Sequence, residues 1–217
     1  MTKIPLSDLQ NQLSADTKAI ILDCRSPEEF DEAFITGSIH IGNQIARYIR
    51  LLKLTPDQDI ILLATSEHTK LIDLFNKLGY ENVKLADAFE DIHELSSLGL
   101  LDLIISIEAD ELAMDLPFDE KARIIDLRSE DEFEKSHIED AENIPLEEFS
   151  DVGTIAEIEE HENIYLYGNT NDISFVGSLI KKQGIHNFRK IQATFEEISK
   201  TPGIKTLKPK NKPAKED

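Results

Sequence analysis

Residues 19–42 read AIILDCRSPEEFDEAFITGSIHIG, and residues 122–145 read ARIIDLRSEDEFEKSHIEDAENIP. Both stretches place the same six residue types in the same order and at the same spacing. They are Asp23, Arg25, Ser26, Glu29, Phe30 and Ile35 in the first stretch, and Asp126, Arg128, Ser129, Glu132, Phe133 and Ile138 in the second. A repeat of this kind indicates two copies of one folded unit within the chain.

The chain has 217 residues, a length that two domains of about 100 residues each would fill. We place the first domain at residues 1–98 and the second at 103–200, with the boundary within 97–102. Each half is large enough to bury a core without disulfides or structural metals. The single cysteine excludes an intramolecular disulfide framework.

The N-terminal segment MTKIPLSDLQNQL lacks the apolar core and the cleavage site of a signal peptide. No apolar run in the sequence approaches the length that spans a membrane. These features predict a soluble, cytoplasmic protein without a membrane partner.

The formal net charge is −20, and it is unevenly distributed. Residues 201–217 carry five lysines, Glu216 and Asp217, which gives this segment +3 and the remainder −23. Its three prolines and few apolar residues predict a disordered Lys/Pro-rich tail. The alternative is a basic arm that contacts an acidic surface of this chain or of a partner. Because the remainder is acidic, we expect no nucleic-acid partner and favour protein partners that are basic.

Strand-like and helix-like patterns alternate in both halves. A helical period at 71–78, and again at 175–180, ends at a glycine, as helices often do. The alternation predicts an α/β protein with a parallel sheet flanked by helices in each half. Short apolar runs typical of buried parallel strands lie at 19–22, 59–64 and 82–85 in the first half and at 123–126, 163–168 and 187–191 in the second.

The pattern Leu-Asp-x-Arg-Ser-Pro-Glu-Glu-Phe, continued by Ile-x-Gly-x-Ile-x-Ile, resembles the rhodanese-like domain. That domain is the fold of the thiosulfate and mercaptopyruvate sulfurtransferases and of the cell-cycle dual-specificity phosphatases. The resemblance covers nearly all of residues 1–200 and implies a tandem form with two such domains. It also implies an active-site cysteine after the central strand, in a loop whose N–H groups and helix N-terminus hold an anion or a persulfide.

Neither copy has that cysteine. The nucleophile positions that the resemblance implies are occupied by Ala64 and Gly168, so we expect no catalytic residue in either copy. The degenerate active-site loops that follow are candidate binding surfaces. They comprise Thr65, Ser66, Glu67, His68, Thr69 and Lys70 in the first copy, and Asn169, Thr170, Asn171, Asp172, Ile173 and Ser174 in the second.

Within these loops, Ser66 and Thr170 are expected to cap the helices that follow, since sulfur transfer needs a thiolate that a hydroxyl cannot replace. Glu67 and Asp172 place a carboxylate in each loop, which would repel an anionic substrate and satisfy the helix N-terminus. Lys70 is a single positive group beside the first loop and is a weak signal for a site.

Cys24 is the only thiol and stands where the second copy has Leu127, so we expect it to be a core residue. His137 has Phe34 as its counterpart, which favours packing over catalysis. The remaining histidines lack metal-ligand spacing, and we expect neither a metal nor a cofactor.

Arg25 and Arg128 occupy the same place in the two copies. The resemblance implies that this arginine is a structural ion-pair partner of a nearby acid, and Glu29 and Glu132 are the candidates.

These observations favour a catalytically inactive tandem rhodanese-like protein that acts as a binding, scaffold or regulatory module. The alternative is a thiosulfate- or mercaptopyruvate-type sulfurtransferase that uses Cys24 or a thiol supplied by a partner. A phosphoester hydrolase ranks last, because the sequence offers no loop thiolate, metal set or basic pocket.

Overall fold

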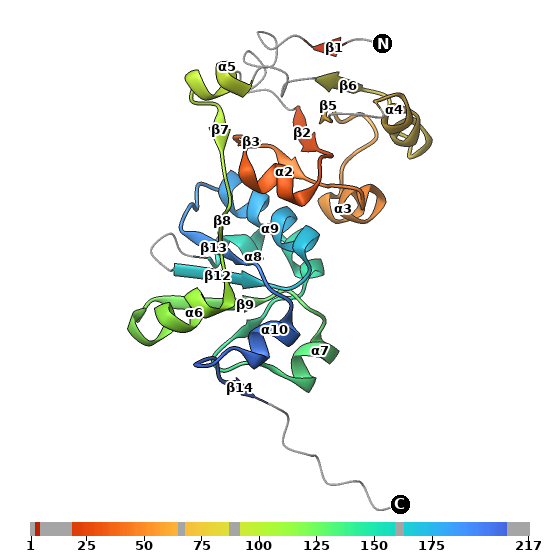
Figure 1. Cartoon of the computed structure of the whole chain (residues 1–217). Helices are drawn as coiled ribbons and strands as arrows, with labels where there is room; N and C mark the ends of the chain where they lie inside the picture. Colours follow the sequence, from red (N-terminus) through yellow and green to blue (C-terminus); the bar gives the residue numbers. More distant parts are fainter. Residues whose placement is uncertain (1–2, 5–18, 65–67, 87–91, 159–162, 208–217) are drawn as a thin grey trace, which may run out of the picture. The chain divides into compact units, whose positions relative to one another are not determined.

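The computed structural model describes residues 3–4, 19–64, 68–86, 92–158 and 163–207. The chain divides into two compact units, which are described separately. The first comprises residues 1–104 together with 177–184, and the second comprises 105–176 and 185–217. Each unit holds a sheet with flanking helices (Figure 1).

Each unit contains a sheet of five parallel strands among the described residues. The strand before the candidate loop is central in both, since β5 (Ile60–Leu63) and β12 (Asn163–Tyr167) each stand third of five. In spatial order the first sheet is β4 (Ile39–His40), β2 (Ile20–Asp23), β5 (Ile60–Leu63), β6 (Val83–Ala86) and β1 (Lys3–Ile4). The second is β11 (Glu142–Asn143), β9 (Ala122–Asp126), β12 (Asn163–Tyr167), β13 (Phe188–Ile191) and β8 (Ile105–Ile107). The predicted α/β class with parallel sheets is confirmed.

Each unit also has a two-stranded antiparallel ribbon, which the sequence patterns do not reveal. In the first unit β3 (Phe34–Ile35) pairs with β7 (Leu101–Asp102), and in the second β10 (His137–Ile138) pairs with β14 (Thr206–Leu207). The segment expected to be a boundary therefore contains a strand of the first unit. The expected tail differs in the same way, because its first residues are folded and Glu139 N donates to Lys205 O at 2.8 Å. Residues 208–217 lie outside the described residues.

Helices connect the strands and flank the sheets. The first unit has α2 (Pro27–Glu32), α3 (Ile45–Leu52), α4 (His68–Lys77) and α5 (Ile92–Ser97). The second has α6 (Ala109–Asp115), η2 (Leu116–Phe118), α7 (Glu130–Lys135), η3 (Leu146–Ser150), α8 (Val152–Ala156), α9 (Thr170–Lys182) and α10 (Phe195–Lys200), with the end of α9 assigned to the first unit. No helix in the described part of the chain is long and apolar enough to cross a membrane.

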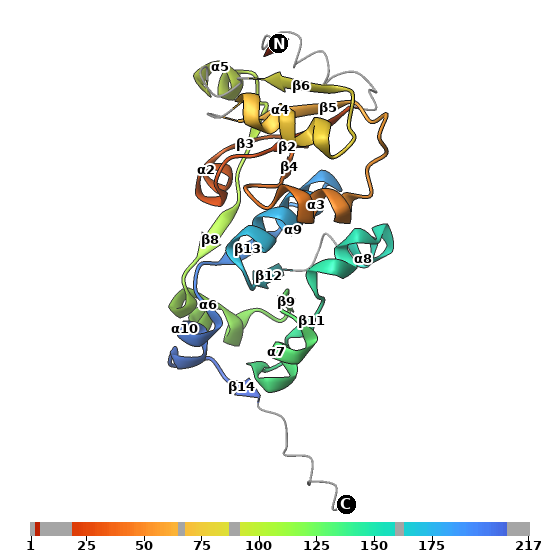
Figure 2. The same cartoon turned by 90° about the vertical axis from the view of Figure 1, so that its right-hand side faces the viewer.

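The connections of the second sheet set which face each helix covers. The crossover from β8 through α6 to β9 and the crossover from β12 through α9 to β13 run in opposite directions across the sheet. Because such crossovers are right-handed, they place α6 and α9 on opposite faces. Figure 2 shows α10 on the same side as α6, and residues of both helices pack in one apolar cluster with Tyr165 and Tyr167.

The same core positions recur in the two units. In the first, the cluster on one face of the sheet comprises Ile21, Ile35, Ile61, Leu63, Ala86 and Leu95. For all of these except Leu95, the counterparts in the second unit are Ile124, Ile138, Tyr165, Tyr167 and Ile191, and Ile198 of the last helix joins the same cluster. The sequence repeat therefore corresponds to a core that packs in the same way in both units. The central strand of the second unit carries the larger side chains.

A buried aspartate–arginine pair stands at the end of β2 and is repeated at the end of β9. Asp23 is fully buried and accepts hydrogen bonds from Arg25 N at 3.0 Å, Nε at 3.0 Å and Nη2 at 2.7 Å. Arg25 also donates to the carbonyl of Ala33 at 2.8 Å. Asp126 and Arg128 repeat this geometry, with Nη2 to Oδ2 at 2.6 Å. The pair fixes where the chain turns from the strand into the next helix.

The expectation that Glu29 and Glu132 are the arginines' partners is wrong. Each glutamate occupies the third position of a helix and accepts a hydrogen bond from the backbone N–H of the preceding cap residue, Ser26 or Ser129. This capping-box geometry turns the carboxylate back toward the helix start, so the ion pair is left to the aspartate at the strand end.

We predict that Asp23→Asn lowers the free energy of unfolding of the first unit by about 3 kcal/mol, because it leaves the buried Arg25 guanidinium without a countercharge. Urea unfolding combined with hydrogen exchange would measure the loss and assign it to a unit. The control is Glu32→Gln, at an exposed carboxylate of the same unit, for which we expect a change of less than about 0.5 kcal/mol. Equal effects of the two substitutions would contradict a structural role for the pair.

Candidate functional site: the loops after the central strands

The positions implied for the nucleophile lie directly after the two central strands. Ala64 follows β5 and is buried, and Gly168 follows β12. Gly168 has φ +150°, and a Cβ built on it would lie 3.1 Å from Leu127 Cβ. Both the backbone conformation and the close approach of Leu127 therefore disfavour any side chain at position 168, including that of cysteine.

The first loop is described only in part. Thr65, Ser66 and Glu67 lie outside the described residues, so the predicted capping by Ser66 and the predicted blocking by Glu67 stay predictions. The other three loop residues, His68, Thr69 and Lys70, form the first turn of α4, and the Lys70 side chain is exposed.

The second loop is described completely, and it leads at once into α9. Asn169 caps this helix, since its side-chain oxygen accepts from Asn171 N at 3.0 Å and its carbonyl accepts from Ile173 N at 2.9 Å. The prediction that Thr170 is the cap is wrong, because the helix already begins at Thr170. The shift by one residue follows from the preference of asparagine side chains for bonding N–H groups two residues ahead.

Polar side chains are buried along the first turns of α9. Asp172 is 6% exposed and Ser174 is fully buried. Ser174 Oγ donates to Thr170 O at 3.1 Å and accepts from Lys190 Nζ at 3.4 Å, and Lys190 is itself only 4% exposed. A carboxylate and an ammonium group are thus both withdrawn from solvent beside this loop, where an anion-binding site would need exposed N–H groups and positive charge.

Sequence reasoning missed Lys190. The sequence feature that could have revealed it is a lysine at an inward position of the strand FRKI, where it places a charge in the core. Charged side chains are almost never fully buried unless paired or hydrogen-bonded, and the Ser174 hydroxyl supplies a hydrogen-bond partner.

The arginines beside the loops are engaged by the fold. Arg128 is held by Asp126 and donates to Ser136 O at 2.9 Å, and the Phe195 ring covers its guanidinium at 3.7 Å. Arg25 is 7% exposed and has the contacts described above. Neither guanidinium is placed to receive an anionic substrate at the loop.

Cys24 directly follows β2, and its N–H donates to Leu63 O at 2.8 Å, as Leu127 N–H donates to Tyr167 O at 2.9 Å. The residue is half-buried. Burial, together with the neighbouring Asp23 carboxylate, raises the pKa of the Cys24 thiol far above its usual range. At neutral pH the thiol is therefore protonated and is a poor nucleophile.

His137 and Phe34 occupy equivalent places and make equivalent contacts. The His137 ring stacks on Phe133 with centroids 3.8 Å apart, and the Phe34 ring stacks on Phe30 at 4.3 Å. The expected packing role of His137 is confirmed. Among the residues that the structure describes, no group of three His, Cys, Asp or Glu side chains could hold a metal ion.

Comparisons with known proteins agree with the geometry. The family model of the rhodanese-like domain matches residues 6–88 and 108–201, so this chain belongs to the rhodanese-like domain family and contains two copies of the domain. A comparison with curated proteins finds no match.

Several solved structures resemble the chain at low identity. A thiosulfate sulfurtransferase from Pseudomonas aeruginosa is 19% identical, with 89% of this chain and 41% of that enzyme covered and a TM-score of 0.41. The Alr3790 protein from Anabaena sp. is 21% identical, with 48% and 92% covered and a TM-score of 0.42. EanB is 16% identical, with 96% and 63% covered and a TM-score of 0.44.

We predict that Gly168→Ala lowers the free energy of unfolding by about 2 kcal/mol, because the added Cβ meets Leu127 in an unfavourable backbone conformation. The matched control is Gly184→Ala, where φ is +83° and no heavy atom lies within 4 Å of the added Cβ. That change should cost about 1 kcal/mol, for the backbone conformation alone. Chemical denaturation would compare the two, and equal losses would show that the contact with Leu127 has no effect.

We also predict that Cys24 resists a thiol reagent such as 5,5′-dithiobis(2-nitrobenzoic acid) in the native protein. Because only the thiolate reacts, the raised pKa should slow the reaction more than about a hundredfold relative to the urea-unfolded chain. Absorbance at pH 8 would follow both states. A native rate close to that of the unfolded chain would show an accessible, ionisable thiol.

Proposed function

We propose that this chain is a catalytically inactive tandem rhodanese-like protein that acts by binding protein partners. The observation that supports this most directly is the residue that follows each central strand. Ala64 and Gly168 stand there, and neither side chain can accept or transfer a sulfur atom, because transfer needs a thiolate.

The surroundings of the loops support the same reading. Arg25 and Arg128 are bound to buried aspartates, and Asp172 brings a carboxylate to the helix start. A thiosulfate or phosphate ion entering here would find both guanidinium groups engaged and the Lys190 ammonium buried, which disfavours anion binding.

The alternative, a sulfurtransferase that uses Cys24, is less well supported, because burial keeps its thiol protonated. A thiol supplied by a partner would require an open anion site at one of the loops. The single half-buried cysteine agrees with a reducing compartment, and we place the binding role in the cytoplasm.

The surface charge indicates the class of partner. Residues 130–157 carry eleven acidic side chains against one basic side chain, Lys135. All but one of these carboxylates are exposed. They lie on α7, on the turn between β10 and β11, on η3 and near α8. A surface of this kind attracts basic partners and accelerates their association by electrostatic steering, an effect that salt weakens.

We predict no cyanide-dependent sulfur transfer from thiosulfate or mercaptopyruvate above background, for the wild-type chain and for Cys24→Ser alike. Thiocyanate formation measures the reaction, and an active sulfurtransferase serves as the positive control. A parallel reaction with added dithiothreitol tests whether a thiol from outside completes the site. Turnover that disappears with Cys24→Ser would refute the proposal and identify Cys24 as a nucleophile, and turnover that needs dithiothreitol would favour a partner's thiol.

A further inference from the structure

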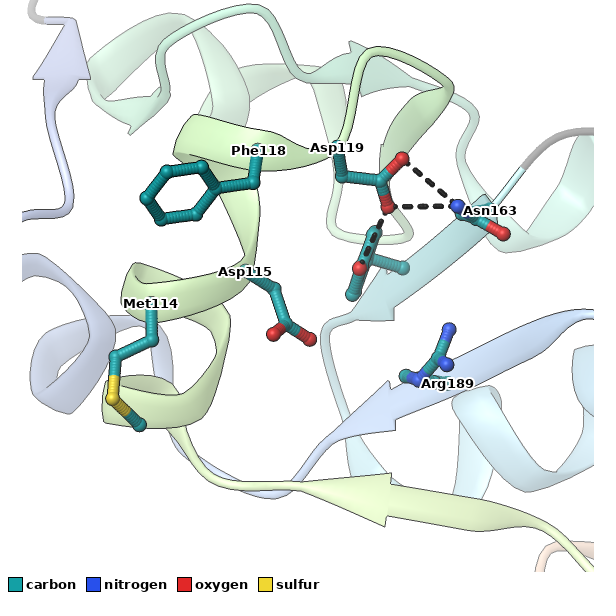
Figure 3. A pocket seen from close by; sticks show the side chains of 7 residues that line it. Met114, Asp115, Phe118, Asp119, Asn163 and Arg189 are labelled. Atoms are coloured by element: carbon teal, nitrogen blue, oxygen red, sulfur yellow. Dashed lines mark hydrogen bonds between the residues drawn. The ribbon is translucent and has the colours of Figure 1, made fainter.

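The second unit has a cavity of about 310 Å³ away from the candidate loop. The cavity lies where η2 passes the first residues of β12 and β13, which is the amino-terminal edge of the parallel strands, whereas Gly168 follows their opposite ends. Figure 3 shows Asp115 and Arg189 extending into the same space. The lining residues are Met114, Asp115, Phe118, Asp119, Asn163, Tyr165 and Arg189.

The back of this cavity is a fixed polar network centred on Asp119. Its carboxylate accepts hydrogen bonds from Asn163 Nδ2 at 2.8 and 3.0 Å, from the Tyr165 hydroxyl at 2.9 Å and from Lys121 N at 3.1 Å. Burial raises the pKa of Asp119, but these hydrogen bonds outweigh burial and the net pKa is lowered. Asp119 therefore stays charged, with both oxygens engaged, and supplies negative potential instead of a free acceptor.

Asp115 is the carboxylate that remains available. It precedes η2 without capping it through its side chain, and it forms no ion pair with any cation in the described part of the chain. Its charge is one of the causes that raise the pKa of Tyr165, which places it close to the cavity. Arg189 lies over the Tyr165 ring, 5.8 Å from its centroid, and its charge offsets that of Asp119. Asp115 therefore leaves one uncompensated negative charge at the opening of the cavity.

The side chains at the rim of the cavity are apolar and largely exposed to solvent. Phe118 is 87% exposed and Met114 is 62% exposed. Ile105, half-exposed, is the register partner of Arg189 on the edge strand β8. Exposed aromatic and methionine side chains beside a half-buried arginine are residue types enriched in protein interfaces, and the buried Tyr165 lies beneath them.

The first unit shows that the fold does not require this site. Its core position equivalent to Tyr165 is Ile61, which has no hydroxyl, and the register partner of Ile61 is Lys84, where the second unit has Arg189. The same strands form and pack with isoleucine there. The tyrosine hydroxyl and the arginine at these two strand positions are therefore features of the second unit alone among the described strands.

We propose that this cavity is a docking site for an arginine side chain of a basic protein partner, with the guanidinium bonded to Asp115 and stacked on Phe118. Arginine fits better than lysine, because its planar fork pairs with a carboxylate through two hydrogen bonds and lies flat on an aromatic ring. Apolar residues beside that arginine would contact Met114 and Ile105. The inference rests on the proposed binding function and assigns it a surface and a partner chemistry.

The probe for a test is the peptide acetyl-Ala-Leu-Arg-Leu-Ala-amide, titrated into the ¹⁵N-labelled full chain and followed by NMR. We expect shifts at Phe118, Asp119 and the Asn163 side-chain amide, and no binding of the peptide that carries glutamate in place of arginine. Asp115→Asn and Phe118→Ala should each weaken binding about threefold, the size of one exposed ion pair or cation–π contact. The control Glu148→Gln removes an exposed carboxylate on η3 and should leave the affinity unchanged.

Shifts spread over the acidic surface, with equal effects of Glu148→Gln and Asp115→Asn, would overturn the docking site in favour of nonspecific charge attraction. Binding that appears only when Lys208, Lys210, Lys212 and Lys215 are replaced by glutamine would make the chain's own tail the occupant and overturn it too. Self-association measured by sedimentation would also overturn the proposed docking site, if Phe118→Ala abolishes that association. Sulfur-transfer activity would refute the proposed function without altering these results, whereas an inactive protein whose cavity ignores the peptide would refute the docking site alone.

Discussion

The fold of each unit depends on one buried ion pair at the end of the strand beside the central one. Asp23 and Asp126 are fully buried, and each holds the arginine two residues later through its side chain and its backbone N–H. A carboxylate in the core is costly unless it is paired and hydrogen-bonded, and the arginine meets both needs while also binding a carbonyl at the far end of the next helix. The pair thereby connects strand, turn and helix. Its recurrence explains why the motif survives in both copies although neither copy has a nucleophile to position.

In the second copy, the backbone keeps the shared fold but disfavours a side chain at the nucleophile position. The approach of Leu127 to Gly168 and the positive φ at that residue disfavour a side chain where the family's nucleophile would stand. In the first copy the change is milder, because Ala64 already has a Cβ and lacks only the sulfur. The only thiol, Cys24, has Leu127 as its counterpart, and the core accepts either side chain at that position. The departures from the family pattern at positions 64 and 168 are therefore local, while the parallel sheets and their flanking helices are kept.

Much of the fold could be predicted from the sequence, because the repeat, the apolar runs and the glycines at helix ends reflect local and periodic constraints on the chain. Three strands of each sheet and the α/β class followed from these patterns. What sequence did not show depends on contacts between residues far apart in the chain. The ribbon strands β7 and β14 are two residues long and carry no period, and the buried Lys190 bonds Ser174, sixteen residues earlier in the chain. Glu29 was a plausible partner for Arg25 by spacing alone. Its position in a capping box, which the sequence also contains, decides otherwise.

The two copies serve as an internal control for what the fold needs. A tyrosine hydroxyl on an inward position of a central strand requires a hydrogen-bond partner, since an unsatisfied buried polar group costs about 1–3 kcal/mol. Tyr165 finds it in Asp119, and Asn163 holds the same carboxylate. Ile61, at the equivalent position of the first unit, has no hydroxyl and needs no hydrogen-bond partner. The Tyr165 hydroxyl and the Asp119 carboxylate thus satisfy each other through one hydrogen bond. The second copy thus combines the shared parallel sheet with a linked polar group beside the exposed side chain of Phe118.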